Sequence, residues 1–416
     1  MTTAARNRSN VRCTLFTALI ALLVPLASGC EAEGAVEPAG DRDVFRSQHH
    51  AFQIDTIVDG LQHPWGIAFL PNGDLLVTER GSPGDDGRPG QLRIVRDGEL
   101  LADPVTGLPE IRVGGQGGLL DVVLHPEFES NRLVYLSYSK PNEDDSEGTT
   151  AVIRGTYEDG ALNDVEEIFE AEAWASGRGH HGSRIAFDHD GYLFVSIGDR
   201  QFSPSGDLEA HPAQDLTNHI GTIVRLHDDG SVPSDNPFVG DDEALPEIWS
   251  YGHRNPQGMA VHPETNEVWA NEHGPQGGDE LNLIRPGVNY GWPVVGFGVN
   301  YGPGTPIHEA VNVAGMEPPV LNWTPSIAPA GMMIYTGDRF PEWRGSVFSG
   351  GMSAQYRVLS RATVDGAQLL NEELLLPGEY RIRDVREGPD GYVYLATDHR
   401  GGDMTPIIRL RPATGR

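Results

Sequence analysis

The chain has 416 residues, with 60 acidic against 30 basic side chains and a formal net charge of −30. Nucleic-acid binding depends on clustered lysine and arginine, so this charge argues against nucleic acid as a partner. The 52 glycines and 31 prolines are too many for a helical bundle, while 38% hydrophobic residues are enough for a core. Because Lys140 is the single lysine, Schiff-base chemistry could use only that residue.

Residues 1–30 have the features of an export signal. A start with three arginines is followed by an apolar stretch over residues 13–26, and the small residues 27–29 precede Cys30. The apolar stretch is too short for a membrane-spanning helix. The site resembles a bacterial lipobox, which predicts cleavage after residue 29 and lipidation of Cys30. Plain secretion with cleavage nearby is the alternative.

This signal sets the predicted domain organisation. Residues 1–29 are the lipoprotein-type signal peptide, and residues 30–50, which are polar without periodicity, indicate a tether. Residues 51–413 show no break that would mark a linker and are predicted to form one folded domain. We expect an exported protein, periplasmic or at the cell surface, that meets a membrane only through its lipid anchor.

One hairpin pattern recurs through the folded domain. Each copy has a short apolar strand, a turn rich in Pro, Asn, Asp and Gly, and a second strand rich in β-branched and aromatic residues. The six copies span residues 66–80, 119–139, 183–199, 257–274, 331–351 and 383–398. Their spacing leaves room for two more strands per unit, which predicts an all-β fold, a six-bladed β-propeller with four-stranded antiparallel blades. A β-sandwich or two separate all-β domains is the alternative.

The repeat also predicts where a functional site lies. In an antiparallel hairpin, the residue before the first strand and the residue after the second strand lie at the same edge. The positions before the first strands are rich in arginine, histidine and amide side chains, and binding groups are expected on loops of a rigid scaffold. These candidates are Gln116, His180, Arg254, Asn255, Arg381 and Arg383. We expect them to lie around the axial channel.

Two kinds of chemistry fit these candidates. An imidazole titrates near neutrality, so His180, with glycines on both sides, is a candidate general base that takes a proton from a hydroxyl group. Arginine matches the geometry of carboxylates, so Arg254, Arg381 and Arg383 indicate a small polyanionic ligand in this acidic protein. The alternatives are a structural histidine, and arginines that each pair with a nearby carboxylate such as that of Asp384.

The loop at residues 271–293 is the candidate metal site. Calcium prefers carboxylate and carbonyl oxygens. Glu272, Asp279 and Glu280 supply carboxylates, and the Gly-Pro pair at 274–275 exposes carbonyls without a competing donor from the proline. The loop has no EF-hand spacing, and a turn-rich connection between blades is the alternative.

Seven segments together point to a known family. In chain order they are PWGIAF, GQGGLLDVVLHPEF, HHGSRIAF, YGHRNPQGMA, EHGPQGGDELN, NYGWP and RIRDVREGPDGYVY. With these segments the chain resembles the soluble pyrroloquinoline quinone (PQQ)-dependent glucose and aldose sugar dehydrogenases, over roughly residues 55–410. The resemblance implies a six-bladed propeller that binds PQQ and calcium.

The resemblance also implies a role for each candidate residue. His180 falls on the general base of the family. Positions that contact PQQ or substrate fall on Gln116, Arg254, Asn255, Tyr301, Arg381 and Arg383. Gly274 and Pro275 fall on the carbonyls that hold the PQQ-bound calcium, while Glu280 and the carbonyl of Tyr290 match a further calcium site in the aldose-dehydrogenase branch.

We therefore expect the protein to oxidise aldose sugars to lactones by hydride transfer to the quinone. The sequence does not identify the acceptor that then takes the electrons. The chain departs from the family at two positions. Ser353 stands near the place where many members put a lysine against PQQ, and Gly179 replaces an acidic residue of the glucose-specific branch. A calcium-dependent propeller lactonase or hydrolase and a non-catalytic carbohydrate-binding propeller are the alternatives.

Overall fold

The computed structural model describes residues 44–82, 87–399, 401 and 403–413. The predicted signal peptide, Cys30 and most of the predicted tether therefore lie outside the described residues. Helical structure in the described ranges is limited to α1 (Phe128–Asn131) and the short 3-10 segments η2 (Pro212–Gln214) and η3 (Pro341–Trp343). None of the helices there is long and apolar enough to cross a membrane.

The strands form successive antiparallel sheets, one for each copy of the hairpin pattern. The first blade consists of β3 (Pro64–Phe69), β4 (Leu75–Glu79), β5 (Gln91–Arg96) and β6 (Glu99–Leu100). The second consists of β7 (Leu119–Leu124), β8 (Leu133–Pro141), β9 (Gly148–Glu158) and β10 (Ala161–Glu170). The third consists of β11 (Ile185–Phe187), β12 (Leu193–Ser196), β13 (Thr222–Leu226) and β14 (Ile248–Tyr251), with β18 (Val288–Asn289) added parallel to β14.

The second half of the chain continues the series. The fourth blade consists of β15 (Pro256–Val261), β16 (Val268–Glu272), β17 (Asp279–Ile284) and β19 (Leu321–Trp323). The fifth consists of β20 (Pro329–Ile334), β21 (Val347–Gly351), β22 (Leu359–Asp365) and β23 (Gln368–Leu375). The sixth consists of β24 (Ile382–Glu387), β25 (Val393–Thr397) and β26 (Thr405–Pro412), completed by β2 (Ala51–Leu61) and β1 (Phe45–Arg46).

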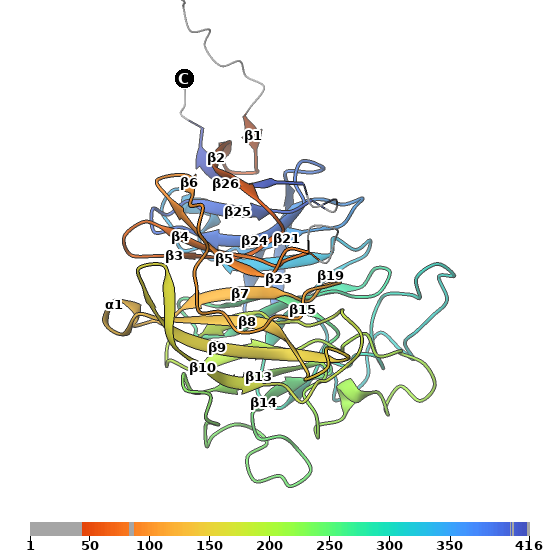
Figure 1. The fold of residues 1–416 in the computed structure, drawn as a ribbon. Coiled ribbons are helices and arrows are strands. Elements are labelled where there is room, and N and C mark those ends of the chain that lie inside the picture. The colour runs from red at the N-terminus through yellow and green to blue at the C-terminus, as the bar shows by residue number, and fades with distance from the viewer. Residues whose placement is uncertain (1–43, 83–86, 400, 402, 414–416) are drawn as a thin grey trace, which may run out of the picture. The chain divides into compact units, whose positions relative to one another are not determined.

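The last sheet joins the two ends of the described chain. β2 pairs antiparallel with β26, so that Ile54 lies opposite Leu410, and Figure 1 shows the two strands side by side. The first strands of the blades contact one another in sequence around a ring, and β24 contacts β3 to complete it. The fold is a closed six-bladed β-propeller, which confirms the prediction. Ring closure leaves few exposed strand edges.

The hydrophobic core lies between the blades. Each pair of neighbouring blades shares one cluster of buried side chains, including the pair formed by the last and the first blade. In that last cluster, Val58 of β2 and Ile407 of β26 pack with Ile67 and Val77 of the first blade. Both faces of a blade are therefore buried, which explains why the repeated strands are apolar runs rather than strictly alternating ones.

The start of the folded domain differs from the predicted boundary. Residues 44–50, which we assigned to the tether, include β1, and Phe45 of that strand lies opposite Phe52 of β2. The ring of His50 packs against Phe340 and Trp343, with ring centroids 5.3 and 5.5 Å apart. The propeller domain thus begins with β1 rather than at residue 51. The partners of this segment lie far along the chain, so its own polar composition did not reveal the pairing.

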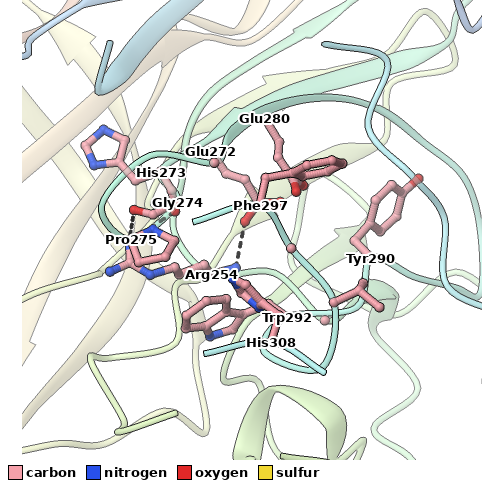
Figure 2. Close-up of a pocket in the computed structure, with 14 residues that line it drawn as sticks. Arg254, Glu272, His273, Gly274, Pro275, Glu280, Tyr290, Trp292, Phe297 and His308 are labelled. Carbon is pink, nitrogen blue, oxygen red and sulfur yellow. Dashed lines mark hydrogen bonds between the residues drawn. The ribbon is translucent and has the colours of Figure 1, made fainter. Parts of the chain in front are cut away.

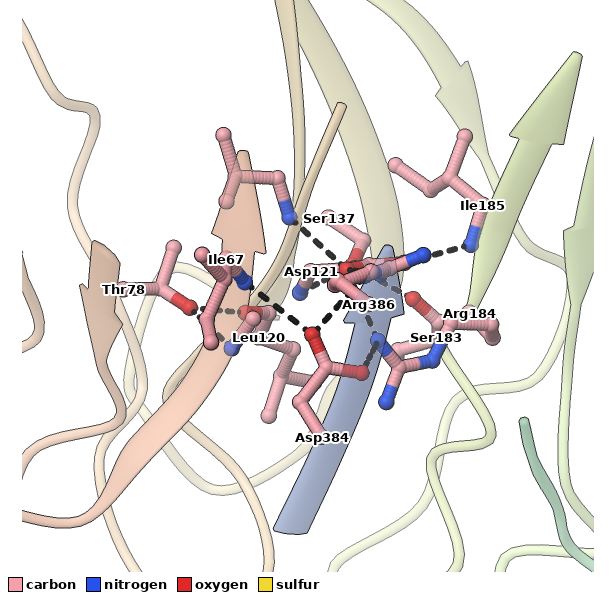
Figure 3. Close-up of polar contacts among 12 residues, drawn as sticks. Ile67, Thr78, Leu120, Asp121, Ser137, Ser183, Arg184, Ile185, Asp384 and Arg386 are labelled. Atoms are coloured by element: carbon pink, nitrogen blue, oxygen red, sulfur yellow. Dashed lines mark hydrogen bonds and ion pairs between the residues drawn. The ribbon is translucent and has the colours of Figure 1, made fainter. Parts of the chain in front are cut away.

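A buried ionic cluster joins the inner strands of four blades (Figure 3). Nη1 of Arg184 lies 2.9 Å from Asp121 and 3.0 Å from Asp384, and Arg386 lies 2.9 Å from each of the same carboxylates. Asp384 also accepts the backbone N–H of Ile67 at 3.0 Å. Because Arg184 and both carboxylates are fully buried, each charge depends on its partners for compensation.

Candidate active site

A cavity of about 250 Å³ opens at the ends where the inner strands begin. This is the edge that the hairpin repeat predicted. Four of the predicted site residues line it, namely Gln116, Tyr301, Arg381 and Arg383. Trp65 and Gln257 form further parts of the wall, and the guanidinium of the buried Arg184 lies 4.1 Å from the centre of the Trp65 ring.

The two arginines of the cavity differ in their partners. Arg381 pairs with Asp398 and donates to the carbonyl of Met352 at 3.1 Å. Arg383 donates to Oε1 of Gln257 at 3.0 Å and has no carboxylate partner among the described residues. Burial and the nearby Arg381 lower the pKa of Arg383 to about 9. The alternative, in which each arginine pairs with a nearby carboxylate, thus holds for Arg381 and not for Arg383. The positive charge of Arg383 is available to an anion.

His180 stands beside this cavity in a fixed orientation. Its backbone lies in the left-handed region, with φ at 46°, and its N–H donates to Oε1 of the cavity residue Gln116 at 2.8 Å. Nδ1 lies 2.6 Å from Oδ1 of Asp199, whose Oδ2 accepts the indole N–H of Trp292 at 2.8 Å. Burial lowers the pKa of His180, and the charge of Asp199 offsets this only in part. The imidazole is therefore neutral at pH 7.

The neutral ring has a defined tautomer. A carboxylate accepts hydrogen bonds only, so Asp199 places the ring proton of His180 on Nδ1. Nε2 is then the acceptor, and it makes no hydrogen bond with any described residue. A histidine held in this way can take a proton from a substrate hydroxyl group.

Arg254 and Asn255 do not line the large cavity, and Arg254 lines the smaller one instead. Nη1 of Arg254 donates to the carbonyl of Gly274 at 2.7 Å, and its Nε is buried without a partner in the described part of the chain. Oδ1 of Asn255 accepts the N–H of Gly182 at 3.2 Å, and its Nδ2 is likewise buried with no partner among those residues. Both unpartnered donors would suit a ligand rich in acceptors.

The Gly-Pro pair at 274–275 forms a tight turn whose carbonyls face other donors. A Cβ added at Gly274 would lie 2.2 Å from the carbonyl oxygen of Gly278, so only glycine fits there. Asp279 accepts the N–H of Gly274 at 2.9 Å, and the carbonyl of Pro275 accepts the hydroxyl of Tyr301 at 2.9 Å. A carbonyl oxygen has two lone pairs, so each can still bind a cation.

A second, much smaller cavity lies next to this turn (Figure 2). Its volume of about 20 Å³ is enough for one ion or one water, and Glu272, Glu280 and Tyr290 line it. Burial and the charge of Glu272 raise the pKa of Glu280 to about 8. Asn282 donates to both carboxylates, at 3.1 and 3.2 Å. Glu280 has no basic partner in the described part of the chain, so its carboxylate would suit a cation.

No group of three or more His, Cys, Asp or Glu side chains in the described ranges is arranged to hold a metal ion. A cation at either place would therefore depend on backbone carbonyls and water besides one or two carboxylates. Such an all-oxygen set is what calcium prefers.

An open groove of about 710 Å³ continues from the large cavity and shares Tyr301 and Ala328 with it. Tyr301 is 66% exposed, although its hydroxyl is fixed by Pro275. Ser353, which we expected near the place of a lysine in related sequences, lines this groove together with the exposed Tyr356. The groove gives a polar molecule a path to the cavity.

Comparison with known proteins shows the family of the chain. The model of the glucose/sorbosone dehydrogenase family matches residues 61–409. The chain belongs to this family. It is 42% identical to the aldose sugar dehydrogenase YliI of Escherichia coli K12 over 360 residues, which cover 85% of this chain and 92% of that protein.

Two solved structures from the same group of enzymes resemble this family member. The apo-form of the soluble aldose sugar dehydrogenase from E. coli has a TM-score of 0.78 at 39% identity and covers 87% of this chain and all of its own. The PQQ-bound form of the aldose sugar dehydrogenase from Streptomyces coelicolor has a TM-score of 0.68 at 29% identity, covering 86% of this chain and 98% of its own.

Trp292 and Gln257 of this candidate site were not predicted from the sequence, and Asp199 was predicted in place but not in its contacts. Asp199 follows a second strand, at the edge where we expected functional groups, but its pairing with His180 has no local signal. Trp292 lies 93 residues beyond Asp199, so no spacing rule connects them. Gln257 is the second residue of β15 and stands two residues after Asn255. Side chains two residues apart on a strand point to the same side, so the place of Gln257 near the predicted site could have been inferred from that of Asn255.

Proposed function

We propose that this protein oxidises aldose sugars to lactones with PQQ and calcium, and that His180 is the general base. One observation carries the proposal: Gln116 lines the arginine-containing cavity and also accepts the backbone N–H of His180, so one side chain links the anion-binding groups to the proposed base. Membership of the glucose/sorbosone dehydrogenase family supports the same reaction.

The residues of the cavity fit PQQ, which carries three carboxylates and an ortho-quinone. Arg383, without a carboxylate partner among the described residues, and Arg381 would bind carboxylates of the cofactor. The unpartnered Nδ2 of Asn255 is a further donor for an acceptor of the ligand. When bound, PQQ supplies the redox chemistry by accepting a hydride from the sugar.

The protein's own part in the reaction is proton transfer and positioning. Nε2 of His180 accepts the proton of the anomeric hydroxyl as the hydride leaves the anomeric carbon, and the carbon–oxygen bond becomes the carbonyl of the lactone. Asp199 holds the proton on Nδ1 and stabilises the imidazolium that forms. Burial of both side chains excludes water and strengthens their interaction.

Calcium fits two places near the cavity. The carbonyls of Gly274 and Pro275 would hold one ion, which would supply Lewis-acid polarisation to the cofactor. Glu280 and the carbonyl of Tyr290 would hold a second ion, whose charge would compensate the buried carboxylate. The export and lipidation expected from residues 1–30 complete the proposal.

Reconstitution tests the proposed function. We expect apo-protein to bind PQQ at micromolar concentration or tighter in the presence of Ca²⁺, and the complex to reduce a redox dye with a panel of aldoses. Absence of PQQ binding in that range would overturn the proposal. Hydrolysis of lactones with calcium alone would indicate a lactonase instead, and neither activity would indicate a binding propeller.

Substitution of Arg383 tests the anion site. Hydrogen bonds to charged groups contribute about 1.5–3 kcal/mol, so Arg383→Ala is expected to raise the Kd for PQQ roughly 10- to 100-fold. The quench of tryptophan fluorescence on PQQ addition measures this. Arg411→Ala is the matched control, because Arg411 pairs with Asp55 away from the cavity. Equal Kd values for the two variants would contradict the role of Arg383.

Calcium binding beside Glu280 is tested by thermal unfolding without PQQ. A ligand at 100 times its Kd stabilises the folded state by about 2.7 kcal/mol, so Ca²⁺ is expected to raise the Tm and a chelator to lower it. Glu280→Gln should lose most of this calcium-dependent shift, whereas the exposed control Glu243→Gln should keep it. The same shift in Glu280→Gln as in the parent protein would exclude this site.

A further inference from the structure

Trp292 lines the smaller cavity and not the large one, and it contacts the partner of the proposed base. Its indole N–H donates to Oδ2 of Asp199 at 2.8 Å, and Oδ1 of the same carboxylate lies 2.6 Å from Nδ1 of His180. Trp292 and His180 are each 6% exposed and Asp199 is 1% exposed. We propose that Trp292 is a positioning residue that acts through Asp199 to fix the orientation and tautomer of His180. This inference rests on the proposed function, because it concerns the same base.

The two oxygens of Asp199 have separate partners. Oδ1 accepts from His180 and from the backbone N–H of Gln201, at 2.6 and 2.8 Å, while the indole is the single donor to Oδ2 among the described residues. Without Trp292, Oδ2 would be a buried charged oxygen without its hydrogen bond. Leaving a buried charged group unpaired costs more free energy than leaving a buried neutral group unpaired. The indole therefore compensates this oxygen and aligns the carboxylate.

The chemistry of the indole explains why tryptophan serves here. Indole N–H is a donor that cannot accept, so it favours an unprotonated, charged Oδ2 on Asp199. With Oδ2 held unprotonated and Oδ1 occupied, the carboxylate can only accept from Nδ1 of His180. The proton stays on Nδ1, and Nε2 remains free to take the substrate proton.

The indole is itself held on several sides. The backbone N–H of Trp292 donates to the carbonyl of Gly252 at 2.8 Å, and its carbonyl accepts from Nε2 of Gln214 at 2.7 Å. The guanidinium of Arg254 lies 5.1 Å from the ring centre, and the ring of His308 packs edge-on at 5.6 Å. Figure 2 shows Trp292 next to Arg254 and His308. A donor fixed in this way can orient a carboxylate.

Other charged and titratable groups also face His180. They are Asp199, Arg200, Arg254, His181 and His273. Substitution of Trp292 changes the charge of none of them. Loss of the indole N–H leaves more negative charge on Asp199 for His180, which favours the imidazolium and raises the pKa of the base. A shift in that pKa therefore reports the hydrogen bond rather than a general loss of packing.

Trp292→Phe in the reconstituted full-length protein tests the inference. We expect kcat to fall roughly 10-fold and the acidic limb of its pH profile to move up by about half a unit to one unit, with the Kd for PQQ unchanged within about twofold. Trp323→Phe is the matched control, because the indole of Trp323 donates to Glu372 at 2.6 Å on an outer strand. The control should leave kcat and the limb unchanged. An unmoved limb in Trp292→Phe, or an equal shift in both variants, would overturn the inference.

A second measurement needs neither turnover nor a folded Trp292 variant. In ¹⁵N-labelled apo-protein, with 7 tryptophans, one indole N–H resonance should shift with pH at the midpoint of the His180 ring, and Asp199→Asn should abolish that response. If no indole resonance follows His180, the inference is overturned even if the parent protein oxidises aldoses. Failure of the proposed function would appear separately, as lack of PQQ binding or of aldose oxidation in the parent protein.

Discussion

His180→Ala is expected to lower kcat for aldose oxidation by at least ~10²-fold, the effect of losing a general base. The substituted side chain does not line the large cavity, whose arginines remain, so PQQ should still bind with nearly the parental Kd. The measurement is steady-state dye reduction at saturating PQQ and Ca²⁺, together with a fluorescence titration of the cofactor. The loss should therefore appear in turnover and not in cofactor occupancy.

The control for this variant is His189→Ala, since His189 is exposed on a turn. It should leave both readouts at the parental level. Unchanged turnover in His180→Ala would remove His180 from its role as the base. Loss of PQQ binding in that variant would show that the histidine helps to bind the cofactor instead.

The pH dependence of the parental enzyme follows from the same group. Burial lowers the pKa of His180 below its ordinary value of 6.5, and the base acts only when its ring is neutral. Activity should therefore be retained at pH 7 and lost as the pH falls through that lowered pKa. The sign is opposite to that of a catalytic acid, whose activity would be lost as the pH rises.

The fold was largely predictable because its signal is local and repeated. Six hairpins carry the inner strands of six blades, and each turn and strand is readable within about 20 residues. The pairing of β1 and β2 with β26 was not readable in this way, because the partners lie at opposite ends of the chain. Residues 44–50 were assigned to the tether for that reason, although Phe45 and His50 pack against the propeller.

The candidate site was predictable in position and less so in its interactions. The edge rule placed Gln116, Arg381 and Arg383 at one cavity, because strand ends are fixed by the hairpins. It could not predict that Arg381 pairs with Asp398. The two residues lie at the two ends of one hairpin, but whether their side chains meet depends on their rotamers. Nor could it tell that a tryptophan from a distant loop holds the partner of the base. The functional roles of these residues stay predictions.

Asp384→Ala is expected to destabilise the fold by about 3–5 kcal/mol, the usual cost of breaking a buried ion pair by removing one partner. Asp384 pairs with Arg184 and Arg386 and accepts the N–H of Ile67, so one carboxylate links the first, third and sixth blades. Its loss leaves Arg184 fully buried with Asp121 as its single acidic partner among the residues that the structure describes. The measurement is the free energy of unfolding by denaturant, or the Tm where unfolding is irreversible.

Glu166→Gln is the matched control, because it breaks an exposed pair in which Glu166 lies 3.1 Å from Arg154 on an outer strand. Exposed pairs contribute little, so the control should change stability only slightly. At temperatures below its melting range, Asp384→Ala should still bind PQQ. The ionic cluster contacts the cavity residue Trp65 through Arg184, but none of its own residues lines the cavity. Equal stability of the two variants would mean that blade packing alone closes the ring. Loss of PQQ binding in a folded Asp384→Ala protein would instead make the cluster part of the cofactor site.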